Sequence, residues 1–477
     1  MAGAKLVVIG LGPVTSYKYS RMIAEAIEAR AASSYCIVDL ESQRHLVEQR
    51  RAALPVQPET VLLLPDAEAA QLTNRVPSAF VKWLDDLAAG HRGSIKVFVA
   101  TEPQAHEAYL RHCMARGFDT LTTKPLVVPM REGRFELSEI VRRTEAVAEL
   151  ARASGASHAV LCLGRHHEVY EQGVRQPLQR VMDSHGTPIT SLHLKTASGV
   201  WNLPSEFLSR DDHPYRYGYG MLMHGAYHYV DVATRLLLLN RRLVPDEELT
   251  LRVSAYAAFP LDQELRIPAD LTRSLRGYEV PHGVLAAGEP LGETDVVAAL
   301  RLCVGDGRTL TLGTIGLEQT TPGMRSWAPF PIVPYNVNGR LHSTDLDVRM
   351  SVLFGVAARV LKVPIGGRLD TADLRARNVA QVTRRVNAVL LGHQEFIAEH
   401  HLQRPHGDSF SYRAEGEIFR RWMDGRATQS DIASHVPTAA VLQALGESIA
   451  GDGREVIVAL DYAEPAWPDE QLVDALA

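Results

Sequence analysis

The sequence predicts an α/β protein that begins with a doubly wound parallel sheet and continues into an α+β domain with an open, mostly antiparallel sheet. Residues 5 to about 165 alternate short apolar β-runs with helical patterns, which is typical of a parallel sheet flanked by helices. Beyond this point the β-runs lengthen, and Gly305-Asp306-Gly307 joins two of them as a hairpin turn would. A chain of 477 residues is also too long for one ordinary core, so at least two domains are expected.

The first domain is expected to contain six strands and a first helix with one apolar stripe. The stripe residues recur at i, i+3, i+4, i+7 and i+8, which places them on one helix face. They are Tyr19, Met22, Ile23, Ala26 and Ile27. The strand candidates are residues 5–9, 35–38, 61–64, 97–100, 120–122 and 159–163.

The second part of the chain is expected to form the open sheet from four longer β-runs. These are residues 189–197, 249–259, 296–304 and 309–318. Residues 371–450 show mainly helical patterns, whereas 262–293 and 320–340 are rich in proline and glycine and are expected to be loops. The expected domains are residues 1–165, residues 166–400 with loop insertions, and C-terminal helices in 401–477 that pack back on both.

The composition excludes several classes of protein. It is 46% apolar and 22% charged, with a formal net charge of −6, which argues against nucleic-acid or acidic-membrane partners. The four cysteines are scattered with no C-x-x-C pair, so a reducing, cytoplasmic location is expected. The N-terminus has no signal-like region, and no apolar run approaches the length of a membrane span.

A glycine turn after the first strand indicates a dinucleotide site of the Rossmann type. Gly10-Leu11-Gly12 stands between a strand and a helix, where the first glycine permits a tight turn and the second lets backbone approach a pyrophosphate; Pro13 and Val14 continue the turn. The third glycine of the fingerprint is absent, and Thr15 stands there. A glycine turn without a cofactor remains the alternative interpretation.

Asp39 strengthens the nucleotide interpretation because it ends the second strand, 27 residues after Gly12. A carboxylate at this place accepts hydrogen bonds from ribose hydroxyls and repels a 2′-phosphate, so NAD is favoured over NADP. Arg44 lies nearby in the sequence and leaves NADP as the less favoured alternative.

Taken in order, the segments GLG, VDLE, VATEPQAH and TTKPL resemble the glucose–fructose oxidoreductase / inositol dehydrogenase (Gfo/Idh/MocA) family. The resemblance implies that Lys124 corresponds to the lysine of the family's E-K-P motif, which contacts the nicotinamide side and the substrate hydroxyl. Thr123 replaces the glutamate of that motif. The loop Thr101-Glu102-Pro103 and His106 match the family's cofactor-lining T-x-P-x-x-H pattern.

The later segment YGMLMHGAYHYVD, residues 219–231, resembles the family's active-site helix. The resemblance places His228 on the catalytic histidine and Asp231 on the acidic residue that follows it. His224 stands where the family usually has aspartate, which changes the usual proton relay. Alcohol oxidation needs a base near neutral pKa and a cation on the substrate oxygen, roles that suit His228 and Lys124.

The spacing of His224, His228 and Asp231 at i, i+4 and i+7 predicts a shared helix face, with the carboxylate orienting a histidine. The same spacing fits metal ligands, but the resemblance explains His228 without one, so no metal is expected. Substrate contacts are expected from the second domain and from the link to it. The candidates are Arg165, Lys195, Trp201, Tyr219 and His224.

The leading hypothesis is an NAD(P)-dependent oxidoreductase that acts on a secondary hydroxyl of a sugar, aminosugar or cyclitol. One alternative is a lyase or glycosidase that oxidises, eliminates and re-reduces with a retained NAD. Another is a non-catalytic nucleotide-binding paralogue, which Thr15 and His224 favour slightly. An open sheet needs a covered face, so a homodimer or homotetramer is expected.

Overall fold

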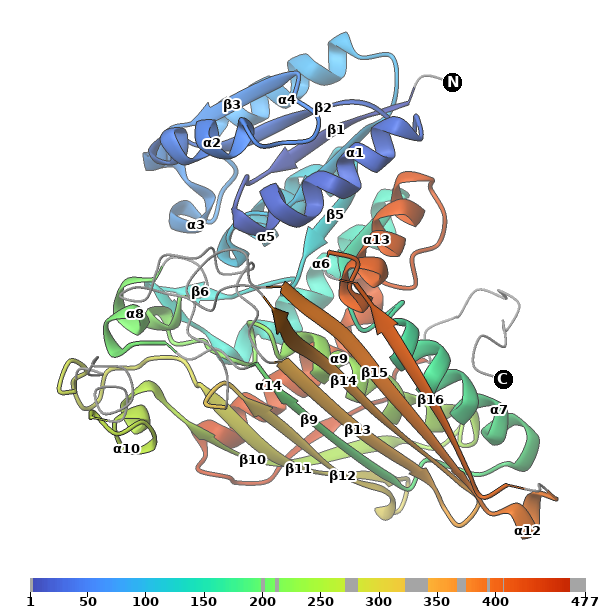
Figure 1. Cartoon of the computed structure of the whole chain (residues 1–477). Helices are drawn as coiled ribbons and strands as arrows, with labels where there is room; N and C mark the ends of the chain where they lie inside the picture. The colour runs from blue at the N-terminus through green and yellow to red at the C-terminus, as the bar shows by residue number, and fades with distance from the viewer. Residues whose placement is uncertain are drawn as a thin grey trace. The chain divides into compact units, whose positions relative to one another are not determined.

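The computed structural model describes residues 3–198, 202–210, 214–270, 282–321, 342–366, 375–392, 395–405 and 407–463 (Figure 1). The chain forms two compact units. The first comprises residues 1–130, 139–166 and 412–436, and the second comprises 131–138, 167–411 and 437–477. The expected separate segment 401–477 is therefore divided between the units. Its helix α13 (Phe410–Met423) lies largely in the first unit, and α14 (Val436–Ala450) lies largely in the second.

The first unit is built on a six-stranded parallel sheet in the order β3-β2-β1-β4-β5-β8. All six predicted strands are confirmed. Their bounds are β1 Ala4–Ile9, β2 Ala32–Leu40, β3 Thr60–Leu64, β4 Ile95–Val99, β5 Asp119–Thr123 and β8 His158–Leu161. Both β1 and β4 are buried along their whole length, as strands covered on two faces must be.

Helices enclose this sheet, and the predicted apolar stripe of the first helix is confirmed. Tyr19, Met22, Ile23 and Ala26 are buried in the core, with Ile27 packed against it. Helix α13 contributes Ile418, Phe419 and Trp422 to the same core. The helices are η1 Thr15–Tyr19, α1 Ser20–Glu28, η2 Glu41–Gln43, α2 Arg44–Arg51, η3 Asp66–Glu68, α3 Ala70–Thr73, α4 Ser78–Gly90, α5 Pro103–Ala115, α6 Ile140–Ser154 and η9 Ile432–His435.

The second unit is built on a nine-stranded sheet in the order β16-β15-β14-β13-β9-β12-β11-β10-β17, antiparallel except between β9 and β12. The four predicted strands are confirmed as β9 Ser191–Ala197, β10 Leu249–Ala258, β11 Asp295–Val304 and β12 Arg308–Glu318, with the hairpin at Gly305–Gly307. The remaining strands are β13 His342–Met350, β14 Phe354–Gly366, β15 Arg375–Val386, β16 Ile397–Arg404 and β17 Val456–Ala459.

The prediction of helices throughout residues 371–450 is wrong for β15 and β16. Along β15 the buried side chains are Asn378, Ala380 and Val382, a period of two. Val379 and Gln381 between them are only partly buried, and arginines precede and follow this run. Arginine and alanine are good helix formers, so their presence concealed the alternation that the sheet imposes.

One face of the large sheet is covered by helices, with η5, α7 and α9 against its strands (Figure 1). Along β9, Leu192, Leu194 and Thr196 point to the covered face, whereas His193 and Lys195 are exposed. The remaining helices and short strands are β6 Met130–Arg131, β7 Arg134–Phe135, η4 Leu137–Glu139, η5 Val169–Arg175, α7 Gln176–His185, α8 Pro204–Ser209, η6 Tyr215–Tyr217, α9 Tyr227–Leu238, η7 Leu239–Arg242, η8 Pro260–Asp262, α10 Gln263–Arg266 and α12 Ala388–Leu391.

The four cysteines are free and buried. Among the described residues, no helix combines the length and apolar character needed to cross a bilayer.

Candidate functional site

The first unit has a topological switch point between β1 and β4, where the strand order reverses direction. In open α/β sheets, ligands bind beyond the carboxyl ends of the strands at such a point. The loops after these two strands are in close contact: a Cβ built on Gly10 would lie 2.7 Å from the Ala100 carbonyl oxygen and 2.8 Å from the Thr101 Cα. Gly10 also has a φ of +97°, so glycine is required here by both space and backbone conformation.

The glycine turn is tied to the end of β2 by a carboxylate. The Leu11 N–H donates to Asp39 Oδ2 and the Leu40 N–H donates to Asp39 Oδ1, each at 2.8 Å. Arg50 donates from Nη1 to the Leu11 carbonyl oxygen at 2.8 Å. Burial raises the pKa of Asp39, while these N–H groups and Arg50 act in the opposite direction. Each carboxylate oxygen retains a lone pair, so Asp39 could still accept a hydroxyl.

Open space lies above the second glycine. A Cβ built on Gly12 would have no heavy atom within 4 Å, so nothing within the protein requires glycine at this position. Pro13 and Val14 beside it are exposed. A glycine that the fold does not need, in the turn where a pyrophosphate would approach, fits a nucleotide-binding loop.

Thr15, which stands where the fingerprint has its third glycine, is buried at the start of η1. This segment is a π-helix before α1 continues as a regular α-helix. The contacts of Gly10, Leu11 and Asp39 are present although the third glycine is missing.

The loop after β5 presents Lys124, which is partly buried and is followed by a cis peptide bond to Pro125. Burial lowers the pKa of the Lys124 ammonium to about 8, with Glu415 and Cys162 opposing the shift and Lys18 adding to it. An amine that titrates near 8 is cationic at neutral pH and can still exchange its proton, as an acid in alcohol chemistry must.

His106 lies between the two loops of the site. Its ring is fully buried, with Nδ1 2.8 Å from the Pro125 carbonyl oxygen and Nε2 3.0 Å from that of Thr101. Burial lowers the pKa of His106 to about 4, so the ring is neutral at neutral pH. A neutral imidazole carries one N–H, so the ring donates to one of these two carbonyl oxygens, and the Thr123 hydroxyl lies 3.4 Å from Nε2. The predicted contact of His106 with a cofactor stays a prediction.

In the second unit, α9 carries two of the predicted catalytic residues. His228 lies in its first turn and is buried, and Asp231 is fully buried one turn later. The Thr438 hydroxyl on α14 donates to Asp231 Oδ1 at 2.7 Å. A buried carboxylate held in this way suits the predicted orienting role better than proton transfer.

His224 lies outside α9, in the turns that precede it, so the predicted continuous helix over His224, His228 and Asp231 is wrong at its first residue. Its backbone N–H donates to the Gly220 carbonyl oxygen at 3.0 Å. The ring meets Tyr215 and Tyr219 edge to face, with centroids 5.0 and 5.3 Å away. Among the described residues, no three His, Cys, Asp or Glu side chains converge as metal ligands.

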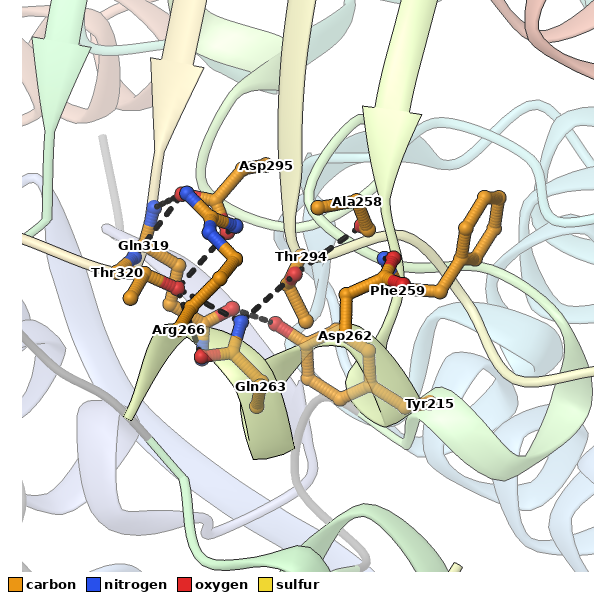
Figure 2. Close-up of polar contacts among 10 residues, drawn as sticks. All are labelled: Tyr215, Ala258, Phe259, Asp262, Gln263, Arg266, Thr294, Asp295, Gln319 and Thr320. Atoms are coloured by element: carbon orange, nitrogen blue, oxygen red, sulfur yellow. Dashed lines mark hydrogen bonds and ion pairs between the residues drawn. The ribbon is translucent and has the colours of Figure 1, made fainter. Parts of the chain in front are cut away.

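A polar network fixes Tyr215, the ring that contacts His224 (Figure 2). The Tyr215 hydroxyl donates to the Gln319 side chain. The backbone N–H groups of Gln319 and Thr320 both donate to Asp295 Oδ1 at 3.0 Å. Gln263 closes the network by exchanging two hydrogen bonds with the Thr320 hydroxyl, at 2.7 and 2.9 Å. The sequence did not reveal this network, because its members come from loops and strand ends far apart in the chain.

Glu293 packs against the segment that precedes α9. Its backbone and that of Gly292 pack against Tyr219 and Gly220 so closely that a Cβ on either glycine would lie about 2.1 Å from backbone atoms. The Leu222 N–H donates to Glu293 Oε1 at 2.7 Å. Burial raises the pKa of Glu293 to about 7, against the lowering effect of these backbone donors. The sequence indicated only a long loop at this position.

Two residues predicted to bind substrate have other surroundings. The fully buried guanidinium of Arg165 donates to the Gln429 carbonyl oxygen at 3.1 Å and to that of Ser434 at 3.0 Å, so it anchors the C-terminal segment of the first unit. The Lys195 side chain is 58% exposed and pairs with Glu318 at 2.8 Å. Since α9 covers the other face of the sheet, the structure does not bring Lys195 together with His228.

The other two predicted substrate residues differ in what can be said of them. Tyr219 is buried and packs between His224 and Phe135, whose ring centroid is 5.5 Å away. Trp201 lies outside the described residues.

Sequence comparison finds no matching family model and no matching curated protein. Structural comparison, in contrast, finds full-length likenesses. A levoglucosan dehydrogenase in complex with NADH and levoglucosan has a TM-score of 0.55 at 14% identity, over 96% of this chain and 99% of that one. An oxidoreductase from Agrobacterium radiobacter, in complex with NAD⁺, L-tartaric acid and magnesium, has a TM-score of 0.52 at 13% identity, over 95% and 98%.

The WlbA dehydrogenase from Bordetella pertussis, in complex with NADH and UDP-GlcNAcA, has a TM-score of 0.50 at 14% identity, over 96% of this chain and 99% of that one. This chain has the fold of these dehydrogenases. The fold predicted from the resemblance to the Gfo/Idh/MocA family, a Rossmann-type sheet followed by an open antiparallel sheet, is therefore confirmed.

Proposed function

We propose that this protein is an NAD-dependent oxidoreductase that acts on a secondary hydroxyl of a sugar, aminosugar or cyclitol. The observation that carries the proposal is the group at the switch point: open space above Gly12, the Asp39 carboxylate beside the turn, and an ammonium on Lys124 with a pKa of about 8. The dehydrogenases of the same fold that are in complex with NAD⁺ or NADH support it.

The residues of the first unit fit a dinucleotide. The glycine turn would hold the pyrophosphate, and Asp39 would accept a ribose hydroxyl. Arg44 pairs with Glu41 at 2.7 and 2.8 Å, so its charge is already engaged, which favours NAD over NADP. When bound, the nicotinamide would supply the acceptor for the hydrogen that leaves the substrate carbon as hydride.

In the proposed mechanism, Lys124 donates a hydrogen bond to the substrate oxygen and favours its alkoxide character. His228 is proposed as the base that removes the hydroxyl proton, and Asp231 as the residue that orients it, as the resemblance implies. Among the substrate residues, only Tyr219 and His224 keep a proposed part, as an aromatic surface within the second unit.

The test is to identify the nucleotide released from freshly purified protein by mass spectrometry and to titrate the protein with NAD and NADP. Exchangeable NAD would justify a polyol screen at the absorbance band of NADH. We expect Lys124→Ala to reduce turnover about 10²-fold or more, the usual size of a lost acid–base contribution. Lys82→Ala, at an exposed lysine on α4, is the matched control.

Tight, retained NAD with product but no net NADH would replace the proposal by the oxidation–elimination–reduction mechanism. Failure to bind either nucleotide would refute the oxidoreductase proposal.

We also propose self-association through the uncovered face of the nine-stranded sheet. Tyr256, Val297 and Leu312 are more than half exposed on neighbouring strands of this face. Tyr256 and Val297 are register partners, and exposed apolar side chains on one sheet face are a common feature of an interface. Sedimentation of the wild-type protein and of Leu312→Arg would test it, and a monomeric wild-type protein would refute it.

A further inference from the structure

Four consecutive residues, 292–295, join the loop before β11 to the large sheet of the second unit, and we call them the connector. The Thr294 N–H donates to the Ala258 carbonyl oxygen, at the end of β10, at 2.8 Å, and the Thr294 hydroxyl donates to the same oxygen at 3.1 Å. Asp295 begins β11 and accepts the N–H groups of residues 319 and 320, which follow β12 (Figure 2). The connector is therefore fixed to three neighbouring strands.

The connector also binds the segment that precedes α9. The Met221 N–H donates to the Glu293 carbonyl oxygen at 2.8 Å, and the Leu222 N–H donates to Glu293 Oε1 at 2.7 Å. Glu293 is buried, and its neighbour Gly292 donates from its N–H to the Tyr215 carbonyl oxygen at 2.9 Å. Glu293 thus accepts hydrogen bonds from two consecutive N–H groups, one with its backbone and one with its side chain.

Two glycines bring the connector and this segment into direct backbone contact. A Cβ built on Gly220 would lie 2.1 Å from the Glu293 carbonyl oxygen, and one built on Gly292 would lie 2.1 Å from the Tyr219 carbonyl carbon. Neither glycine has a positive φ, so the close approach, and not the backbone conformation, requires glycine at both positions. The sequence therefore has glycine where the two segments must touch.

The hydrogen bonds continue from this contact to the start of α9. Met221, whose N–H is bound by Glu293, accepts the Ala226 N–H with its carbonyl oxygen at 3.1 Å. Ala226 is the N-cap residue of α9, and its own carbonyl oxygen accepts the Tyr229 N–H at 2.8 Å. His228 lies inside this first turn. A continuous path of hydrogen bonds therefore runs from the large sheet through Glu293 to the turn that holds His228.

We propose that Glu293 is a positioning residue for the two histidines of the candidate site: it fixes the turn that contains His224 and, through Met221, the start of α9 with His228. The inference deepens the proposed function and rests on the part assigned there to His228. Glu293 itself touches no substrate in this scheme. Because a reacting group must be held within about 0.5 Å of its productive position, a loosened turn would reduce turnover.

Two variants of Glu293 separate the part of its side chain from that of its backbone. In Glu293→Ala the carbonyl oxygen still accepts the Met221 N–H, whereas the Leu222 N–H loses its acceptor. In Glu293→Gln an amide oxygen remains to accept that N–H. The pKa of Glu293 is about 7, so measurements at about pH 6 compare two mostly neutral side chains. Glu289→Ala, at an exposed glutamate of the same loop, is the matched control.

The first measurement is hydrogen–deuterium exchange of single backbone amides, by mass spectrometry with electron-transfer fragmentation. Glu293→Ala is expected to speed exchange of the Leu222 amide about tenfold, because a buried donor loses its hydrogen bond. Exchange of the Ala226 amide should become faster as well, since the path to α9 is loosened. Exchange in Glu293→Gln and in Glu289→Ala is expected to match that of the wild type.

The second measurement reports on the histidines directly. In protein labelled with ¹³C-histidine, the ring resonances of His224 and His228 are assigned by their absence in His224→Gln and His228→Gln. The rings of Tyr215 and Tyr219 lie edge to face with His224, so a displaced turn changes its ring-proton shifts. We expect both histidines to shift in Glu293→Ala and to return in Glu293→Gln. A residue that contributed only to stability would leave these shifts of the folded protein unchanged.

Unchanged exchange at Leu222 or unmoved histidine resonances in folded Glu293→Ala, or equal effects in Glu289→Ala, would overturn the inference. If Glu293→Ala does not fold, the wild-type protein decides: a Leu222 amide that exchanges as slowly as that of Ala226 supports the inference, and one as fast as the exposed residues 286–288 refutes it. Neither measurement needs nucleotide or substrate, so failure here is distinguishable from failure of the proposed function, which the NAD titration reports.

Discussion

The two glycines of the turn after β1 are expected to respond to alanine in opposite ways. Gly10 is required by the fold: its φ is +97°, and a Cβ would lie 2.7 Å from the Ala100 carbonyl oxygen. Gly12 is not required, because a Cβ there meets nothing within 4 Å. If the open space above Gly12 belongs to a pyrophosphate, its alanine variant will fold normally and bind NAD poorly.

The magnitudes follow from the geometry. A left-handed backbone costs an alanine about 1–2 kcal/mol. At Gly10 the contact with the neighbouring loop adds to this cost, so Gly10→Ala is expected to lose more than about 2 kcal/mol of unfolding free energy. For a unit of this size that corresponds to a fall of roughly 4–8 °C in the melting temperature of the first unit. Gly12→Ala is expected to stay within about 0.5 kcal/mol of the wild type.

Gly117→Ala is the matched control, since Gly117 has a φ of +72° but no atom within 4 Å of a Cβ. It isolates the cost of backbone conformation from the cost of the loop contact. Thermal unfolding followed by circular dichroism gives the stabilities, and isothermal titration calorimetry gives the NAD affinity. We expect Gly12→Ala to weaken NAD binding at least tenfold, which is about 1.4 kcal/mol. Wild-type affinity in this variant would refute the assignment of the turn to a phosphate.

Three further outcomes are expected. In Asp39→Asn, the amide oxygen can accept only one of the two backbone N–H groups that the carboxylate accepts. The affinity for NAD should therefore fall about tenfold, and the preference for NAD over NADP should shrink. Parallel titrations with the two nucleotides measure both effects. In the folded protein the pKa of Glu293 is about 7, so the folded state favours the protonated form more than the unfolded state does. The free energy of unfolding should therefore fall as the pH rises from about 4.5 to 7, by up to about 3 kcal/mol. Glu293→Gln should abolish this pH dependence in urea titrations. Thr438→Val removes the hydroxyl that donates to the buried Asp231 carboxylate and should lower the free energy of unfolding by about 1–3 kcal/mol. Thr438→Ser keeps a hydroxyl and should largely restore the stability. An unchanged midpoint of urea unfolding in Thr438→Val would contradict the role assigned to this bond.

The sequence predicts the first unit well because its strands are apolar on both faces and are separated by amphipathic helices. The strands of the second unit are harder, since the uncovered face carries charged residues such as Arg359 and Asp345, which pair with each other. On β15 these polar positions hide the alternation of Ala380 and Val382, and the pattern resembles a helix. Strands exposed on one face carry about half the apolar signal of buried ones.

In the candidate site, too, the positions set by local sequence could be predicted, whereas those set by tertiary contacts could not. The placement of Gly10, Asp39 and Lys124 near the carboxyl ends of parallel strands could be predicted, and such ends meet at one edge of a sheet. Lys195 lies in β9, and a strand does not reveal which face receives each side chain until its register is known. Arg165 lies in the turn after β8, where its partners come from residues far along the chain. Thr438 donates to Asp231 from more than 200 residues away in the sequence, and no local pattern marks it.

Two of the departures from the resembling family, Thr15 and His224, have different structural consequences. Thr15 is buried at the start of a π-helical turn, and the contacts that shape the glycine turn are present. His224 sits among the rings of Tyr215 and Tyr219, with Tyr215 held by the network that ends at Asp295. A carboxylate there would lie against aromatic rings and lose solvation, whereas an imidazole ring packs edge to face with them. These surroundings favour histidine over aspartate at this position.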